Sequence, residues 1–276
     1  MFRDSKPRSM KQTLVGLLRK SRLLPLVDRA RFVVVGLRSV RNNRAYLAQH
    51  PGFVAPPAFL LYDAYSHVNY RAYAEDGRGP AQYLAGVATR YLGSDCALSV
   101  CEWGCGPARI LRHLPPLLPP GSRVFGTDYN ERTIAWCATH VPEVAFRVNR
   151  LAPPLPFSTG ELDFLFAVSV LTHLSEELHV AWIEELKRVV RPGGLILVTV
   201  HGDRCVAGLT AEERAAYDAG RLVVRGMVLE GSRTFVAYQS PRFMREVLLR
   251  DLEILQHNPP DAPRLARVQD VYLVRR

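Results

Sequence analysis

Apolar and polar positions follow two alternating periods along most of this chain. Beyond position 97, short apolar runs alternate with segments whose apolar residues recur at helical spacing. The pattern predicts strands near 97–103, 122–128, 143–148, 162–169 and 194–201, and helices near 107–114, 130–140 and 175–190. Strands alternating with helices are typical of a parallel sheet covered on both faces. We therefore predict an α/β fold for this region.

Local signals mark the ends of several elements. Ser175 is an N-cap with two glutamates behind it, and Arg191-Pro192-Gly193-Gly194 ends that helix and leads into the next strand. Thr210-Ala211-Glu212-Glu213 is a capping box for a short helix. The rest of the chain predicts a small β insertion at 220–238, a helix starting at Ser240-Pro241, and strands near 252–257 and 268–274.

The first hundred residues have a different pattern. Residues 1–50 form a basic amphipathic arm, which Pro25 divides into two predicted helices, with apolar positions such as Leu14, Leu18, Phe32 and Leu37 among arginines. Prolines and a glycine then introduce a linker, and 58–92 is helical in pattern and rich in tyrosine. We therefore divide the chain into an arm at 1–50, a helical lid or linker at 51–96 and a main domain at 97–276.

The charge of the chain is confined to the arm. Residues 1–50 hold 12 Lys or Arg and 2 Asp, a balance of +10, whereas the remaining 24 basic and 24 acidic residues cancel. The arm is expected either to contact anionic lipid or another acidic surface, or to pack on its own domain with its arginines solvated. The five cysteines form no disulfide framework and no apolar run spans a membrane. We expect a cytoplasmic protein, peripheral at the inner membrane face if the arm binds lipid.

The most informative motif is Glu102-Trp103-Gly104-Cys105-Gly106-Pro107-Ala108, at the end of the first predicted strand of the main domain. Its glycines allow a tight turn and let a ligand lie against the backbone. Asp128 closes the next strand, 24 positions after Gly104. A carboxylate in that position can accept hydrogen bonds from both hydroxyls of a nucleoside ribose. The pair predicts a nucleoside site at the carboxyl ends of two parallel strands.

Arg109 stands where a dinucleotide fingerprint needs its last glycine. The register Glu-x-Gly-x-Gly-x-Ala instead resembles the first motif of the class I S-adenosylmethionine-dependent methyltransferases, with Ala108 in place of the third glycine. The segments 155–157, 162–174 and 186–194 are similar to later segments of that family. The resemblance implies a Rossmann-like, doubly wound, mostly parallel seven-stranded sheet with an antiparallel last strand, here carrying an N-terminal helical extension.

The resemblance also implies roles for individual residues. Glu102 would orient the methionyl end of S-adenosylmethionine, which the turn Gly104-Cys105-Gly106 lets approach the backbone. Asp128 would bind the ribose and Tyr129 pack on the adenine. Asn149 would bond the adenine amino group, and Ser169 would lie beside the methyl donor. No metal is expected, because Cys101 and Cys105 lack a second ligand pair.

On the acceptor side, His173 and His201 follow the fourth and fifth strands and are candidates for a general base. Their alternatives are a helix-entry residue and a loop residue, with no base used at all. Lid candidates are Tyr65, His67, Tyr70 and Tyr73, whose alternative is an aromatic core stripe.

We predict methyl transfer to a small-molecule, glycan or lipid-linked acceptor, at oxygen. The rivals are an RNA methyltransferase that uses the basic arm, and a cofactor-binding scaffold without catalysis.

Overall fold

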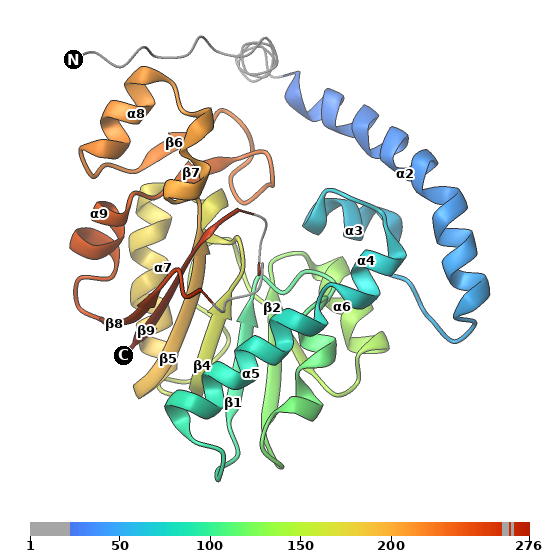
Figure 1. The fold of residues 1–276 in the computed structure, drawn as a ribbon, viewed down its shortest axis with the longest axis horizontal. Coiled ribbons are helices and arrows are strands. Elements are labelled where there is room, and N and C mark those ends of the chain that lie inside the picture. The colour runs from blue at the N-terminus through green and yellow to red at the C-terminus, as the bar shows by residue number, and fades with distance from the viewer. Residues whose placement is uncertain (1–22, 261–264, 266–267) are drawn as a thin grey trace.

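The computed structural model describes residues 23–260, 265 and 268–276. Its centre is a seven-stranded sheet in the order β3-β2-β1-β4-β5-β9-β8 (Figure 1). The strands are β1 (Ser99–Trp103), β2 (Arg123–Asp128), β3 (Ala145–Val148), β4 (Leu162–Ala167), β5 (Val190–Val200), β8 (Glu253–His257) and β9 (Asp270–Arg275).

The pairing of the strands confirms the predicted fold class. Strand β1 pairs in parallel with both β2 and β4, whereas β9 lies antiparallel between β5 and β8. The chain moves outward from β1 through β2 to β3, then returns to place β4 and β5 on the other side of β1. Open α/β sheets bind ligands where the strand order reverses in this way, at the carboxyl ends of the strands.

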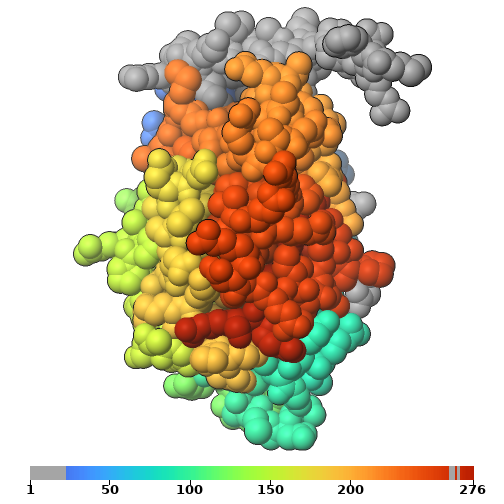
Figure 2. All heavy atoms as spheres, turned by 90° about the vertical axis from the view of Figure 1, so that its left-hand side faces the viewer, coloured from blue at the N-terminus to red at the C-terminus, as the bar shows by residue number. Residues whose placement is uncertain are grey.

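Alternate residues of each central strand point to opposite faces, so the sheet has two cores. On one face, Cys101, Leu165 and Ile196 pack with α7 (Glu176–Val189) and α9 (Pro241–Phe243). On the other, Val100 and Phe164 pack with α5 (Arg78–Leu92) and α6 (Glu131–His140). Figure 2 shows α9, β8 and β9, in orange-red to red, together on one side of the molecule.

The predicted helix at 107–114 is wrong. The chain there forms turns, followed by two short 3-10 helices, η1 (Leu111–His113) and η2 (Pro115–Leu117). Ala108 has a φ of 59°, which lies in the left-handed region and cannot continue an α-helix. Pro115 and the proline after it also lack the amide hydrogens that a longer helix would need.

Other local signals are confirmed. Ser175 caps α7, and the capping box at Thr210 starts α8 (Ala211–Asp218). The predicted insertion contains the hairpin β6 (Val223–Arg225) and β7 (Val236–Tyr238). Ser240 caps α9, which continues as a π-helical turn, η5 (Met244–Leu248). The remaining 3-10 helices are η3 (Leu171–His173) and η4 (Asp203–Gly208).

The N-terminal part of the described chain consists of α2 (Leu24–Gln49), α3 (Ala58–Tyr65) and α4 (Tyr70–Glu75). Pro25 lies in the first turn of α2, and the other predicted arm helix, before it, falls outside the described residues. Asn43 joins α2 to the start of α4, because its side chain donates to Val68 O and accepts from Tyr70 N. Among the described helices, none is long and apolar enough to cross a membrane.

Candidate active site

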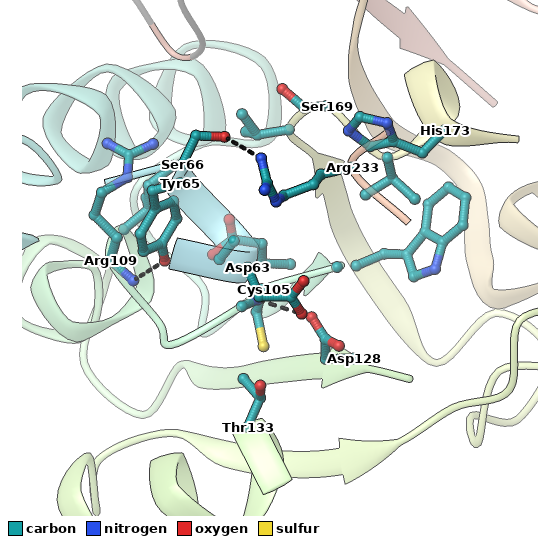
Figure 3. Close-up of a pocket in the computed structure, with 18 of the residues that line it drawn as sticks. Asp63, Tyr65, Ser66, Cys105, Arg109, Asp128, Thr133, Ser169, His173 and Arg233 are labelled. Carbon is teal, nitrogen blue, oxygen red and sulfur yellow. Dashed lines mark hydrogen bonds between the residues drawn. The ribbon is translucent and has the colours of Figure 1, made fainter. Parts of the chain in front are cut away.

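A cavity of about 1300 Å³ lies at the carboxyl ends of β1, β2, β4 and β5. Its wall includes the turn after β1, residues of α3, and the chain between β6 and β7, which contributes Arg233. Figure 3 shows two groups of side chains around it: Cys105 and Asp128 on one side, and Ser169, His173 and Arg233 on the other. The strand-end residues named from sequence therefore share one cavity with parts of the chain far from them.

The turn after β1 needs both of its glycines. Gly104 has a φ of 73° and Gly106 a φ of 51°. A Cβ on Gly104 would lie 2.3 Å from Val170 Cγ2, and one on Gly106 would lie 3.1 Å from Ala64 Cβ. The amides of Gly104 and Cys105 donate to Thr127 O, at 2.8 and 2.9 Å, which fixes the turn against β2. The positive φ disfavours a side chain at both positions, and Val170 also leaves no space for one at Gly104.

The two acidic residues beside this turn are held differently. The Asp128 carboxylate accepts from Gly106 N at 3.0 Å and from Asn130 N at 2.8 Å, and burial raises its pKa to about 6. Glu102 is 4 % exposed, and its Oε2 atom has no hydrogen-bond partner in the described chain. Burial raises the pKa of Glu102 to about 8. The Asp128 carboxylate is therefore held in place by backbone amides, whereas Glu102 keeps an oxygen that can still accept a hydrogen bond.

Asn149 supplies a second unused acceptor. Its amide nitrogen donates to Arg150 O at 2.7 Å, while its buried Oδ1 has no partner among the described residues. Buried polar atoms are normally hydrogen-bonded, so unpaired ones in a cavity wall indicate a polar ligand. Glu102 and Asn149 line the same cavity as Asp128, and all three offer acceptors. S-adenosylmethionine carries matching donors in its ammonium group, ribose hydroxyls and adenine amino group, so these residues fit it.

The raised pKa of Glu102 has a consequence for stability that can be measured. Between the usual pKa of 4.5 and about 8, the folded protein holds this proton and the unfolded chain releases it. The free energy of unfolding therefore falls as the pH rises through this range, by up to about 4 kcal/mol for one such group. Denaturant unfolding of the wild type and Glu102→Gln at pH 5 and pH 8 measures the difference. If the free energy of unfolding changed equally with pH in the two proteins, the raised pKa of Glu102 would be contradicted.

The two histidines are oriented by backbone carbonyls of β7 and of the residue just before it. His173 Nδ1 donates to Phe235 O at 2.7 Å, and His201 Nδ1 donates to Ala237 O at 3.0 Å. A carbonyl oxygen can only accept, so each Nδ1 carries the hydrogen and each Nε2 keeps its lone pair. Burial lowers the pKa of both rings, that of His201 to about 4. Both imidazoles are therefore neutral near pH 7, as a general base must be.

Other predicted residues also lie in the cavity wall. Tyr65 accepts a hydrogen bond from Arg109 N at 3.3 Å, and His67 lies beside it on the loop after α3. Tyr129 is 45 % exposed and donates to Gly231 O in the insertion. Ser169 donates to Gln269 Oε1 at 3.0 Å.

Two of the four lid candidates do not line the cavity. Tyr73 is fully buried behind the glycine turn, where its hydroxyl donates to Pro107 O at 2.8 Å. Tyr70 packs with Phe53 at the side of α4 that contacts α2. For these two residues, the lid assignment is wrong and the aromatic core stripe is the correct alternative.

Sequence reasoning missed Arg233 and Asp63. Arg233 forms an ion pair with Asp28 of α2 and lies over the Tyr62 ring. It also donates to Ser66 Oγ at 3.2 Å (Figure 3). Asp63 lies on α3 and lines the cavity near it. The sequence marks residues 220–238 as an insertion, but no local signal shows that it folds back over the sheet to meet α2.

Comparisons with known proteins indicate the class of domain that this chain contains. A family described as "Methyltransferase domain" matches residues 100–194. A probable S-adenosylmethionine-dependent methyltransferase of Mycolicibacterium smegmatis is 36% identical over 113 residues, which is 41% of this chain and 40% of that protein. A tRNA (carboxymethyluridine(34)-5-O)-methyltransferase of Arabidopsis thaliana is 36% identical over 104 residues, 37% of this chain and 23% of that protein. The chain spans less than half the length of these two relatives.

Solved structures agree on the fold. A TehB-like S-adenosylmethionine-dependent methyltransferase of Corynebacterium glutamicum gives a TM-score of 0.52 at 17% identity, over 80% of this chain and all of that one. One from Methanosarcina mazei gives 0.50 at 18% identity, over 69% of this chain and 96% of that one. Fold and site define an α/β domain that binds a nucleoside cofactor. The chain carries a class I S-adenosylmethionine-dependent methyltransferase domain, with S-adenosylmethionine as its cofactor.

Proposed function

We propose that the protein transfers the methyl group of S-adenosylmethionine to a hydroxyl oxygen of a small-molecule, glycan or lipid-linked acceptor. The observation that carries the proposal is the size and division of the cavity. Its volume of about 1300 Å³ exceeds the roughly 300–1,000 Å³ of a single-ligand site. One side offers unpaired acceptors and the other offers two neutral histidines, which supports two molecules bound side by side.

On the cofactor side, each residue has a separate task. Glu102 would take the ammonium group, Asp128 the ribose hydroxyls and Asn149 Oδ1 the adenine amino group. The backbone at Gly104 and Gly106 would lie against the methionyl part, where no side chain blocks it. When bound, S-adenosylmethionine supplies a methyl group already activated on a sulfonium, so the protein mainly positions the acceptor and excludes water.

On the acceptor side, we assign His173 as the general base. S-adenosylmethionine would supply the methyl group, with its sulfur as the leaving atom that keeps the electron pair of the carbon–sulfur bond. His173 Nε2, whose lone pair the bond from Nδ1 to Phe235 O leaves free, would take the hydroxyl proton as the acceptor oxygen bonds to the methyl carbon. His201 is close enough for its ring to share electrostatic interactions with His173, and it is the second candidate. The polar wall of Ser169, Gln269 and Arg233 suits a hydroxylated acceptor.

One comparison favours a second candidate function. The Arabidopsis relative is named as a tRNA methyltransferase, and the 12 basic residues in the first 50 positions here would suit phosphates. In that case RNA would bind with strong salt dependence. The rest of the chain, with 24 basic and 24 acidic residues, has no net charge to attract a polyanion. This balance supports an acceptor smaller than RNA at the cavity itself.

Methyl transfer from trideuteromethyl-labelled S-adenosylmethionine to cell extract separates these functions. The extract is divided into aqueous small molecules, lipids and RNA, and each fraction is searched by mass spectrometry for the added label. We expect label in the aqueous or lipid fraction with wild-type protein, and less label with Asp128→Ala at a cofactor concentration that does not saturate the variant. Label confined to RNA would favour the second candidate, and none in any fraction, with cofactor binding intact, would favour a scaffold.

A further inference from the structure

Helix α2 is apolar on two opposite faces. Its inner face packs on the body of the protein: Phe32 lies 5.1 Å from the Tyr62 ring, and Tyr46 packs against Phe53. On the other side an outer stripe recurs every three, four or seven residues, and its members are Leu26, Val27, Val33, Val34, Leu37 and Val40. All six are exposed, Leu26 by 62%, Val33 by 56% and Leu37 by 70%. A helix needs only one apolar face to pack on its own domain. The exposed outer stripe therefore indicates that α2 also contacts another surface.

The charges of α2 indicate what that contact is. Five exposed arginines accompany the outer stripe: Arg29, Arg31, Arg38, Arg41 and Arg44. None of them forms an ion pair with a described residue. The one acidic residue of the helix, Asp28, faces inward and pairs with Arg233 and Tyr62. The outer surface of α2 therefore combines apolar side chains with unbalanced positive charge.

We propose that α2 docks on an anionic lipid bilayer, lying in the plane of the interface with the outer stripe in the headgroup and acyl boundary. The flanking arginines would reach lipid phosphates while their stems stay along the apolar surface. At 26 residues the helix offers about 39 Å of contact. The proposal concerns a surface outside the cavity, so it stands or falls independently of methyl transfer.

The positive charge of the outer surface of α2 also argues against two other partners for it, a second copy of the chain and the chain's own N-terminal segment. A second copy would bring the same five arginines against these five, and like charges across an interface oppose association. The N-terminal segment 1–22 carries seven basic residues and one acidic residue, so it would be repelled as well. An anionic membrane supplies the missing negative charge together with an apolar phase.

Vesicle cosedimentation of the full chain tests the proposal, with phosphatidylcholine vesicles that contain or lack phosphatidylglycerol. Arg38→Gln/Arg41→Gln removes two charges and Val33→Ser/Leu37→Ser cuts the outer stripe. Matched controls are Arg90→Gln/Arg221→Gln, on exposed arginines elsewhere, and Val180→Ser/Val247→Ser, whose valines are 46% and 42% exposed. Circular dichroism melts establish that each variant folds.

We expect the wild type to bind phosphatidylglycerol vesicles and to be released by salt. Loss of two arginines should lower partitioning about thirtyfold, at about 1 kcal/mol for each charge near the surface. The stripe variant should lose about tenfold or more, and the controls should bind as the wild type does.

Absence of wild-type binding at low salt would overturn the proposal, as would equal losses in the α2 variants and their controls. A dimer that Val33→Ser/Leu37→Ser disperses, without vesicle binding, would assign the face to a second copy instead. If Val33→Ser/Leu37→Ser does not fold, the vesicle binding of Arg38→Gln/Arg41→Gln against its control tests the proposal.

Discussion

Replacing Asp128 with alanine is expected to weaken binding of S-adenosylhomocysteine by about 1–3 kcal/mol, or roughly five- to 150-fold. The substitution removes the acceptor for the ribose hydroxyls. It also frees the amides of Gly106 and Asn130, which the carboxylate holds at 3.0 and 2.8 Å. The glycine turn would lose the contact that fixes it beside the ligand. Isothermal titration calorimetry of the two proteins measures the change.

The pH dependence of the same titration adds a second check. Because burial raises the pKa of Asp128 to about 6, protonation should weaken the wild type's affinity as the pH falls below that value. Asp128→Ala has no such carboxyl group and should lose this component. Asp95→Ala, at an exposed carboxylate outside the cavity, is the matched control. Unchanged affinity in a folded Asp128→Ala protein would remove this residue from the cofactor site.

Replacing His173 is expected to lower turnover by about a hundredfold or more while cofactor affinity stays the same. The imidazole is neutral at physiological pH because burial lowers its pKa, and Nε2 keeps the free lone pair. His173→Asn is the sharper variant, since its amide can still donate to Phe235 O. His173→Ala would leave that carbonyl unpaired and add a folding effect.

The pH profile of turnover separates a base from a structural residue. At saturating cofactor, the wild-type rate should fall only at pH values below the usual histidine pKa of 6.5, where His173 takes up a proton. This acid limb should disappear in His173→Asn. His201→Asn is the comparison, because His201 Nδ1 bonds in the same way to Ala237 O, two residues after Phe235. Full turnover in His173→Asn would exclude His173 as the base, and loss of cofactor binding would make its role structural.

Much of the sheet can be predicted from sequence because its signals are local. Short apolar runs mark β1 and β4, whose residues are almost all buried, and the N-caps Ser175 and Thr210 mark the starts of α7 and α8. The prediction failed at 107–114 because Ala108 adopts a left-handed conformation that its residue type does not signal. The glycine turn, not helix propensity, determines the backbone there.

The site was predictable in part for the same reason. Glu102 and Asp128 are found by their spacing from Gly104, which is fixed by one strand–turn–strand unit. The orientation of His173 by Phe235 and the pairing of Arg233 with Asp28 join segments more than sixty residues apart. The pattern of apolar and polar residues near these positions indicates neither contact. The burial of Tyr73 beneath Pro107 also depends on how α4 meets the main domain.

Calorimetric titration of the full chain with S-adenosylmethionine, S-adenosylhomocysteine and NAD tests the central claim, that the cavity beside Gly104 and Asp128 is a methyl-donor site. Arg109 occupies the position where a dinucleotide site needs glycine, so NAD should give no binding heat. We expect saturable one-to-one binding of S-adenosylmethionine and S-adenosylhomocysteine. Saturable binding of NAD, with neither sulfur ligand bound, would contradict it.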